Sequence, residues 1–140
     1  MSIQAQLLPL FVQVALTLVL LFWMGYVRTE AFKSGAVRPR DIALREPNWP
    51  PGATQIANAY HNQLELPLLF YVLTILAIIT RKADLLFVVM AWIFVALRVV
   101  QAYIHVTDNY VQRRGLAFIL SAVVLTIMWA IFMLRILIAF

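Results

Sequence analysis

The alternation of apolar and polar positions divides the chain into four long apolar runs separated by three polar connections. The runs cover approximately residues 7–27, 55–80, 85–106 and 116–140. A helix needs about 20 apolar residues to cross the hydrocarbon core of a bilayer, so each run is long enough for one span. The pattern therefore predicts an all-α integral membrane protein, in which a single domain over residues 1–140 forms a four-transmembrane-helix bundle.

The composition agrees with this fold class. Hydrophobic residues make up 64% of the chain and charged residues 12%, whereas soluble domains have about 45–50% and about 25%. The chain has no cysteine, which excludes disulfides, thiolate metal sites and a cysteine nucleophile. The net charge of +5 comes from Lys and Arg between the apolar runs, where membrane topology explains them, so no nucleic-acid partner is predicted.

The distribution of Lys and Arg predicts the orientation of the spans. The connections at residues 28–54 and 107–115 hold five and two basic residues, whereas the connection between the second and third runs holds two. Because positive residues are retained on the cytoplasmic side, residues 28–54 and 107–115 are predicted to be cytoplasmic loops and both termini to lie outside. Thr54 precedes the second run and is a candidate N-cap for its helix.

The second run opens with four polar side chains at helical spacing: Asn58, His61, Asn62 and Glu65. Positions i, i+3, i+4 and i+7 lie on one face of a helix. A carboxylate in a membrane segment faces a bundle interior or a water-filled cavity, because lipid cannot solvate it. Pro67 follows and lacks the N–H for a helical hydrogen bond, so a kink or a loosened turn is expected there.

The third run has its own polar face, formed by Arg98, Gln101 and His105 at i, i+3 and i+7. Glu65 and Arg98 lie at the same depth, roughly 12–14 Å from the cytoplasmic side at a rise of about 1.5 Å per residue. A lone charge in hydrocarbon costs several kcal/mol, so we predict a Glu65–Arg98 ion pair, inside the bundle or across a subunit interface. Such a pair is either a purely structural link between helices or part of a binding site.

The polar residues of the second and third runs lie in the cytoplasmic half of both helices, and Arg28 and Arg114 lie at the same mouth. Together they predict a polar, net-positive pocket open to the cytoplasm, suited to an anionic, peptide-like small molecule. His61 and His105 have no third ligand at a recognisable spacing, so no metal site is predicted.

The chain resembles the membrane-associated proteins in eicosanoid and glutathione metabolism, the MAPEG family. The resemblance covers nearly the whole chain: four spans, a basic first cytoplasmic loop, Asn62-x-x-Glu65 followed by Pro67, Arg98 in the third span, and Arg114 at the start of the fourth. It implies a MAPEG-like homotrimer that binds glutathione, as co-substrate, between neighbouring subunits at the cytoplasmic side.

The resemblance also implies roles for single residues. Arg28 falls on a glutathione-contacting arginine at the end of the first helix, and Asn62 and Glu65 fall on the family's asparagine and glutamate. Glu65 would contact the amino end of glutathione, and Arg98 matches the third-helix arginine. Arg114 falls on the arginine held near the thiol, which makes it the candidate catalytic residue because it would stabilise a thiolate electrostatically.

Other positions depart from the eicosanoid-metabolising members. Asn58 and His61 stand where those enzymes carry arginines, and Gln101 and His105 replace a histidine and a tyrosine. Phe118 falls where the fourth helix has a tyrosine. His61, Gln101 and His105 remain candidate glutathione-binding residues. These departures are typical of a divergent bacterial-type member and imply a multi-pass protein of the bacterial inner membrane.

The leading hypothesis is a membrane-bound glutathione transferase or peroxidase that acts on lipophilic electrophiles entering from the lipids around it. The first alternative is a non-enzymatic binding or assembly protein with the same fold, which would form the trimer without thiol chemistry. The second alternative is a small proton-coupled multidrug transporter, since four short spans with one buried carboxylate also suit that function. Proton-coupled efflux that is lost in Glu65→Ala would favour this last alternative.

Overall fold

The computed structural model describes residues 1–45, 47–108 and 111–138. Its helices are α1 (Ile3–Lys33), the 3₁₀ helix η1 (Pro39–Asp41), α2 (Pro51–Asn62), α3 (Leu66–Ile79), α4 (Leu85–Val106) and α5 (Val111–Ile138). Four helical segments are long and apolar enough to cross a membrane, with α2 and α3 together forming the second. The predicted all-helical fold with four spans is therefore confirmed.

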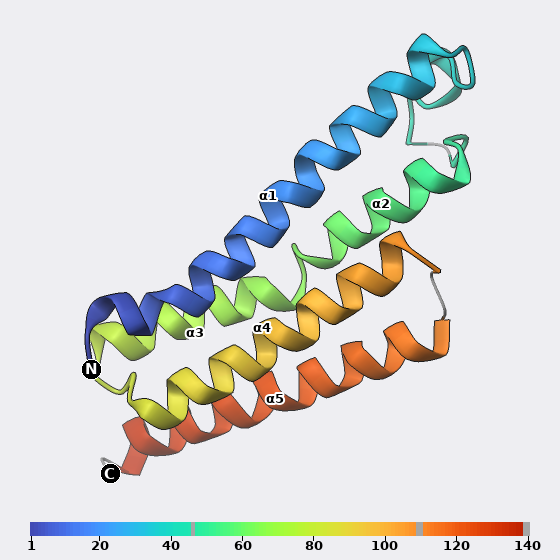
Figure 1. Ribbon diagram of the computed structural model, residues 1–140. Coiled ribbons are helices and arrows are strands. Elements are labelled where there is room, and N and C mark those ends of the chain that lie inside the picture. The colour runs from blue at the N-terminus through green and yellow to red at the C-terminus, as the bar shows by residue number, and fades with distance from the viewer. Residues whose placement is uncertain (46, 109–110, 139–140) are drawn as a thin grey trace.

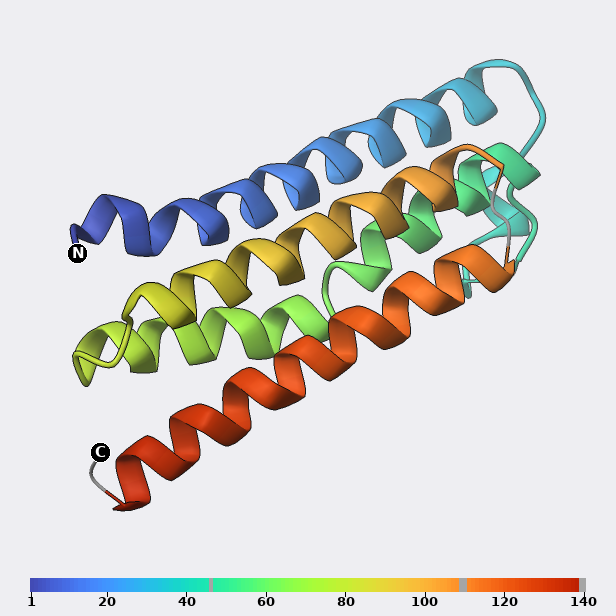
Figure 2. The ribbon, with the colours of Figure 1, turned by 60° about the horizontal axis from the view of Figure 1, so that its bottom comes forward.

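The four spans run alternately up and down (Figure 1). Both termini and the α3–α4 connection lie at one end, and the α1–α2 loop and the start of α5 lie at the other. The central element is α4, which packs against α1, α2 and α5. Figure 1 shows α4 next to α5, and Figure 2 shows it beside α1. Because α2 and α5 both pack on α4 but contact each other little within the described residues, a space is left between them near the loop end.

The apolar core occupies the half of the bundle near the termini. The rings of Phe70 on α3 and Phe94 on α4 stack there with centroids 4.9 Å apart, and Leu73, Val95 and Leu125 are buried around them. Towards the loop end, three of the buried side chains of α4 are polar, namely Arg98, Gln101 and His105, next to the small apolar Ala102. The bundle thus has one half that provides packing and another in which polar side chains meet.

The first span is longer than its apolar run, because α1 continues to Lys33. Just beyond its end lies Gly35, whose φ of +76° is in the left-handed region that glycine adopts without steric cost. The N–H groups of Gly35 and Ala36 donate to the carbonyls of Phe32 and Ala31, which satisfies two of the last helix carbonyls. The predicted cytoplasmic connection therefore begins as helix, and Arg28 lies on the helix surface.

The second span also begins earlier than expected. Pro51 is the first residue of α2, a position that suits proline because its φ is already helical and its missing N–H needs no partner there. Thr54, the predicted N-cap, lies inside the helix and donates its hydroxyl to the Pro50 carbonyl at 3.3 Å. That prediction was wrong because the proline starts the helix three residues before Thr54.

The loop between α1 and α2 is held by contacts of its own residues. The Arg38 N–H donates to the Asp41 carboxylate at 3.0 Å, and the Arg38 side chain pairs with the same carboxylate at 3.4 Å. These two bonds hold the pKa of Asp41 below its usual value. Farther on, Trp49 packs edge-on against Phe32 and lies 4.8 Å below the Arg28 guanidinium, so the loop folds back onto α1.

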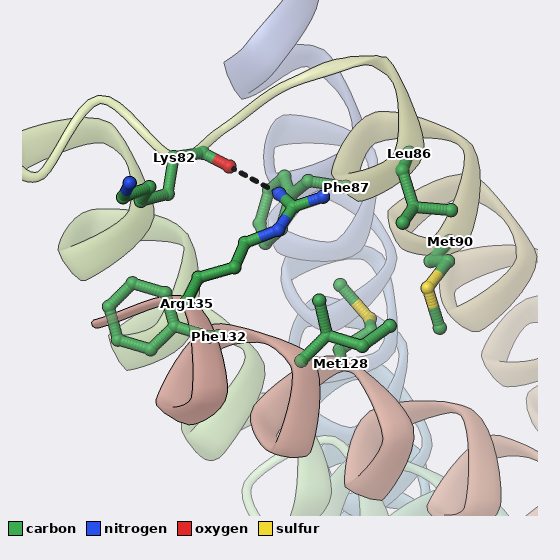
Figure 3. A pocket seen from close by; sticks show the side chains of 8 residues that line it. Lys82, Leu86, Phe87, Met90, Met128, Phe132 and Arg135 are labelled. Atoms are coloured by element: carbon green, nitrogen blue, oxygen red, sulfur yellow. Dashed lines mark hydrogen bonds between the residues drawn. The ribbon is translucent and has the colours of Figure 1, made fainter. Parts of the chain in front are cut away.

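The turn between α3 and α4 ties the third and fourth spans together at the termini end. Asp84 caps α4, since its carboxylate accepts the Phe87 N–H at 3.1 Å. Arg135 of α5 pairs with the same carboxylate at 2.9 Å and also donates to the Lys82 carbonyl at 3.4 Å (Figure 3). Partial burial raises the pKa of Asp84, but the hydrogen bonds from Arg135 and Phe87 outweigh it and leave the pKa lowered.

We expect Asp84→Ala to reduce stability by about 0.5–2 kcal/mol, because it removes both the helix cap and the partner of Arg135. Asp84→Asn is the matched control, since asparagine still caps but carries no charge. Because the folded-state pKa of Asp84 is lowered, its stabilisation is present above its ordinary pKa of 3.8 and is lost as pH falls through the folded-state value. Thermal unfolding in detergent at pH 7 and below pH 4 checks this. An Asp84→Asn variant with the same acid sensitivity as the natural chain would contradict it.

Candidate functional site

A break in the second span determines the geometry of the candidate site. We expected one helix over residues 55–80 with a kink or a loosened turn near Pro67, whereas the helical structure stops at Asn62 and restarts at Leu66. Between them the N–H groups of Gln63, Leu64 and Glu65 donate to carbonyls only three residues back. Pro67 occupies the first turn of α3, where its missing N–H is harmless. The proline thus ends one helix and begins the next, which is a larger effect than a kink.

Arg98 satisfies one carbonyl that the break releases. In a continuous helix the Asn62 carbonyl would accept the Leu66 N–H. Here it accepts the Glu65 N–H at 3.4 Å and, at the shorter distance of 2.6 Å, Arg98 Nη2. The Arg98 side chain is completely buried, and its guanidinium lies 5.9 Å from the centre of the Phe118 ring. Arg98 therefore reaches from α4 to the end of α2 and caps it from the side.

This contact corrects the predicted Glu65–Arg98 ion pair. Among the residues that the structure describes, Glu65 forms no ion pair, although its carboxylate is close enough to Arg98 for an electrostatic interaction. The prediction was wrong within one chain because it treated residues 55–80 as one helix, whereas at the break the Asn62 carbonyl lacks the Leu66 N–H and accepts Arg98. A pair across a subunit interface stays a prediction.

Gln63 satisfies a second carbonyl at the break. Its side-chain Nε2 donates to the Ala59 carbonyl at 3.1 Å, and its Oε1 accepts Gln13 Nε2 of α1 at 2.8 Å. Both glutamine side chains are at most 1% exposed. Inside a membrane span water cannot bond backbone groups, so these side chains provide the partners that the break requires.

A recess lies beside the break, between α2 and α5 with α4 behind it. We call it the main recess; it has a volume of about 380 Å³, within the range of about 300–1,000 Å³ of small-molecule sites. It is lined by Asn58, His61, Asn62, Glu65, Gln101, His105, Arg114, Gly115 and Phe118. Six of the eight predicted site residues therefore meet in one place: His61, Asn62, Glu65, Gln101, His105 and Arg114.

The main recess presents opposite charges and unused hydrogen-bonding atoms. Glu65 supplies a carboxylate and Arg114 a guanidinium, from the α2–α3 break and from α5. On α4, Gln101 Oε1 and His105 Nδ1 are buried without a hydrogen-bond partner. Buried polar atoms of this kind cost free energy unless they are paired, so a polar ligand in the recess would stabilise them. The arrangement suits a small molecule that carries both charges and several polar groups.

The two remaining predicted site residues lie elsewhere. Arg98 is buried behind Asn62 and does not line the main recess. Arg28 lines a second recess of about 430 Å³, the adjoining recess, together with Ile42, Arg45, Pro47, Trp49, Thr54, Ala57, Asn58 and His61. Asn58 and His61 belong to both recesses and form the wall between them. The structure therefore separates Arg28 from Arg114 within one chain.

Two residues that matter at the break were missed in the sequence. Gln13 is an amide inside the first apolar run, and that isolated polar position was the available signal. Gln63 lies between Asn62 and Glu65 but points to the opposite side, into the bundle. No helical periodicity predicts its role, since the role arises only from the break. Within the described residues no group of three His, Asp or Glu side chains is placed to hold a metal ion.

The sequence profile of the MAPEG family matches residues 6–134, nearly the whole chain. The chain belongs to the MAPEG family. Comparison with curated proteins and with solved structures gave no match. Together with the four membrane spans, membership makes this an integral, multi-pass MAPEG protein. The family includes glutathione-dependent transferase-like and peroxidase-like members as well as non-enzymatic ones, so the activity has to be argued from the main recess.

We expect Glu65→Gln and Arg98→Met to differ in stability, because only Arg98 satisfies a backbone carbonyl. Arg98→Met should cost about 1–3 kcal/mol by leaving the Asn62 carbonyl without its strong donor. Glu65→Gln should change stability by less than about 0.5 kcal/mol, because Glu65 faces the recess. Thermal unfolding of both variants in the same detergent measures the difference. Equal losses in the two variants would show that the residues act as an ion pair after all.

Proposed function

We propose that this MAPEG protein is a glutathione-dependent membrane enzyme that conjugates or reduces lipophilic electrophiles. The observation that carries the proposal is the convergence of Glu65, Arg114 and the amide and imidazole groups of α2 and α4 in the main recess. A recess of this polarity within the spans favours a ligand-binding function over a purely structural one.

Glutathione fits the chemistry of the main recess. It is a tripeptide with an ammonium group, two carboxylates, two peptide groups and a thiol. Glu65 would hold the ammonium group, and Asn62 and His61 would bond its polar backbone. Gln101 Oε1 and His105 Nδ1, buried and unpaired, would receive partners from it. Arg98 would act from behind, by fixing the Asn62 backbone, and not by touching the ligand.

Arg114 is the proposed catalytic residue. A guanidinium near the thiol lowers the free energy of the thiolate, which is the reactive form of the sulfur. In conjugation the thiol loses its proton, the sulfur electron pair forms a bond to the electrophilic carbon, and the bond to the leaving group breaks. With a hydroperoxide the thiolate attacks the O–O bond, which yields an alcohol and a sulfenic acid. A second glutathione then converts the sulfenic acid into the disulfide and water.

We further propose that the site is completed by assembly into a homotrimer, as the family resemblance implies. Arg28 lies in the adjoining recess of its own chain, so a ligand that contacts both Arg28 and Arg114 would span the wall at Asn58 and His61 or lie between two subunits. The recesses would face the cytoplasm, because most of the Lys and Arg residues between the spans lie at the loop end of the bundle. Lipophilic substrates would arrive from the surrounding lipid.

Calorimetry with purified protein should detect glutathione binding, and ultraviolet absorbance should detect bound thiolate. Arg114→Gln should lower the thiolate signal at least about tenfold, because it removes the stabilising charge. Arg113→Gln is the matched control: Arg113 is the neighbouring basic residue, highly exposed and 4.0 Å from Asp108. The control should retain the natural thiolate signal.

One result would reject this function, and another would reject the catalytic role of Arg114. Absence of binding at millimolar glutathione would exclude the enzyme and favour the non-enzymatic alternative. An equal loss of thiolate in the Arg113 and Arg114 variants would show that general positive charge, and not a placed guanidinium, supports the sulfur.

A further inference from the structure

The amide pair Gln13–Gln63 lies outside the main recess and has no part in the proposed chemistry. Gln13 belongs to α1, and Gln63 is the first residue of the break. Burying an amide pair among apolar side chains costs free energy wherever its polar atoms lack hydrogen-bond partners. The Gln13 side chain makes only one of its possible contacts, since Nε2 donates to Gln63 while Oε1 has no partner.

We infer that Gln13 and Gln63 are positioning residues that fix the break so that Asn62 and Glu65 face the main recess. Gln63 Nε2 caps the Ala59 carbonyl and Gln63 Oε1 is held by Gln13, so both ends of the amide are bound. The side chain can therefore leave the bundle interior only by breaking two hydrogen bonds. This inference rests on the proposed function for its consequence in ligand binding, but the geometry of the break can be measured without it.

The backbone around Gln63 explains how this pair affects the recess without lining it. Gln63 points into the bundle, whereas Asn62 before it and Glu65 two residues later line the recess on the other side. If the Gln63 side chain turns outward, the short turn that joins α2 to α3 must turn with it. The Asn62 carbonyl would then move away from Arg98, and the 2.6 Å hydrogen bond by which Arg98 caps α2 would be lost. One hydrogen bond from α1 thus controls the placement of two side chains that line the main recess.

Gln13→Met tests the pair, because methionine has a similar shape and cannot donate. Thr74→Val is the matched control: Thr74 is equally buried, and its hydroxyl donates to the Phe70 carbonyl of its own helix, away from the break. Hydrogen exchange read by mass spectrometry should be about tenfold faster in a peptide covering residues 58–66 for Gln13→Met and unchanged there for Thr74→Val. Unchanged exchange at the break in Gln13→Met overturns the inference. So does a uniform increase over all helices, which would indicate a general role in stability.

Ligand binding provides the second readout. Gln13→Met should raise the Kd for glutathione about tenfold and leave kcat within about twofold of the natural value. The reason is that Gln13 positions the binding residues without touching the reacting atoms. The double variant Gln13→Met, Gln63→Met should bind no more weakly than Gln63→Met alone, since the two amides act as one unit. Additive losses would overturn the inference. If the natural protein binds no glutathione, the proposed function fails, while hydrogen exchange still decides whether the pair holds the break.

Discussion

The need to satisfy backbone carbonyls inside a membrane span is the constraint on which this structure depends. Pro67 interrupts the second span, and no water is available in lipid to bond the released groups. Two buried side chains, one from α4 and one from the break itself, bond these groups. Arg98 caps the Asn62 carbonyl and Gln63, itself held by Gln13, caps the Ala59 carbonyl. Three buried polar side chains, Arg98, Gln63 and Gln13, therefore have a role at a single interruption of one helix.

The same interruption shapes the site. Because Arg98 is engaged by a backbone carbonyl, Glu65 is not neutralised by a direct ion pair within its chain and faces the main recess. Because α2 and α5 contact each other little, the recess between them stays open towards Arg114. The opposite half of the bundle contains the stacked rings of Phe70 and Phe94 and the Asp84–Arg135 pair. Its packing offsets the free-energy cost of burying polar groups in the other half. Stability and binding are thus concentrated at opposite ends of the bundle.

Much of this arrangement follows from sequence periodicity, and the rest does not. The four apolar runs predict the spans, and helical spacing groups Asn58, His61 and Asn62 on a common side because α2 keeps its helical geometry up to Asn62. Glu65 lines the same recess although it lies beyond the end of α2. The error over Arg98 came from treating residues 55–80 as one helix, since a residue's partners depend on which carbonyls are free. The role of Gln63 was hidden for the same reason. Arg28 was assigned to the site by resemblance, and its placement depends on how the α1–α2 loop folds back onto α1.

A structure of the protein in lipid nanodiscs with glutathione added would test the central claim most directly, namely that the capped break presents Asn62 and Glu65 to a peptide-like thiol. The account predicts ligand density in the main recess, in contact with Glu65 and with its sulfur near Arg114, while Arg98 still bonds the Asn62 carbonyl. Lipid alone in the recess, or Arg98 turned from that carbonyl to the Glu65 carboxylate, would contradict it.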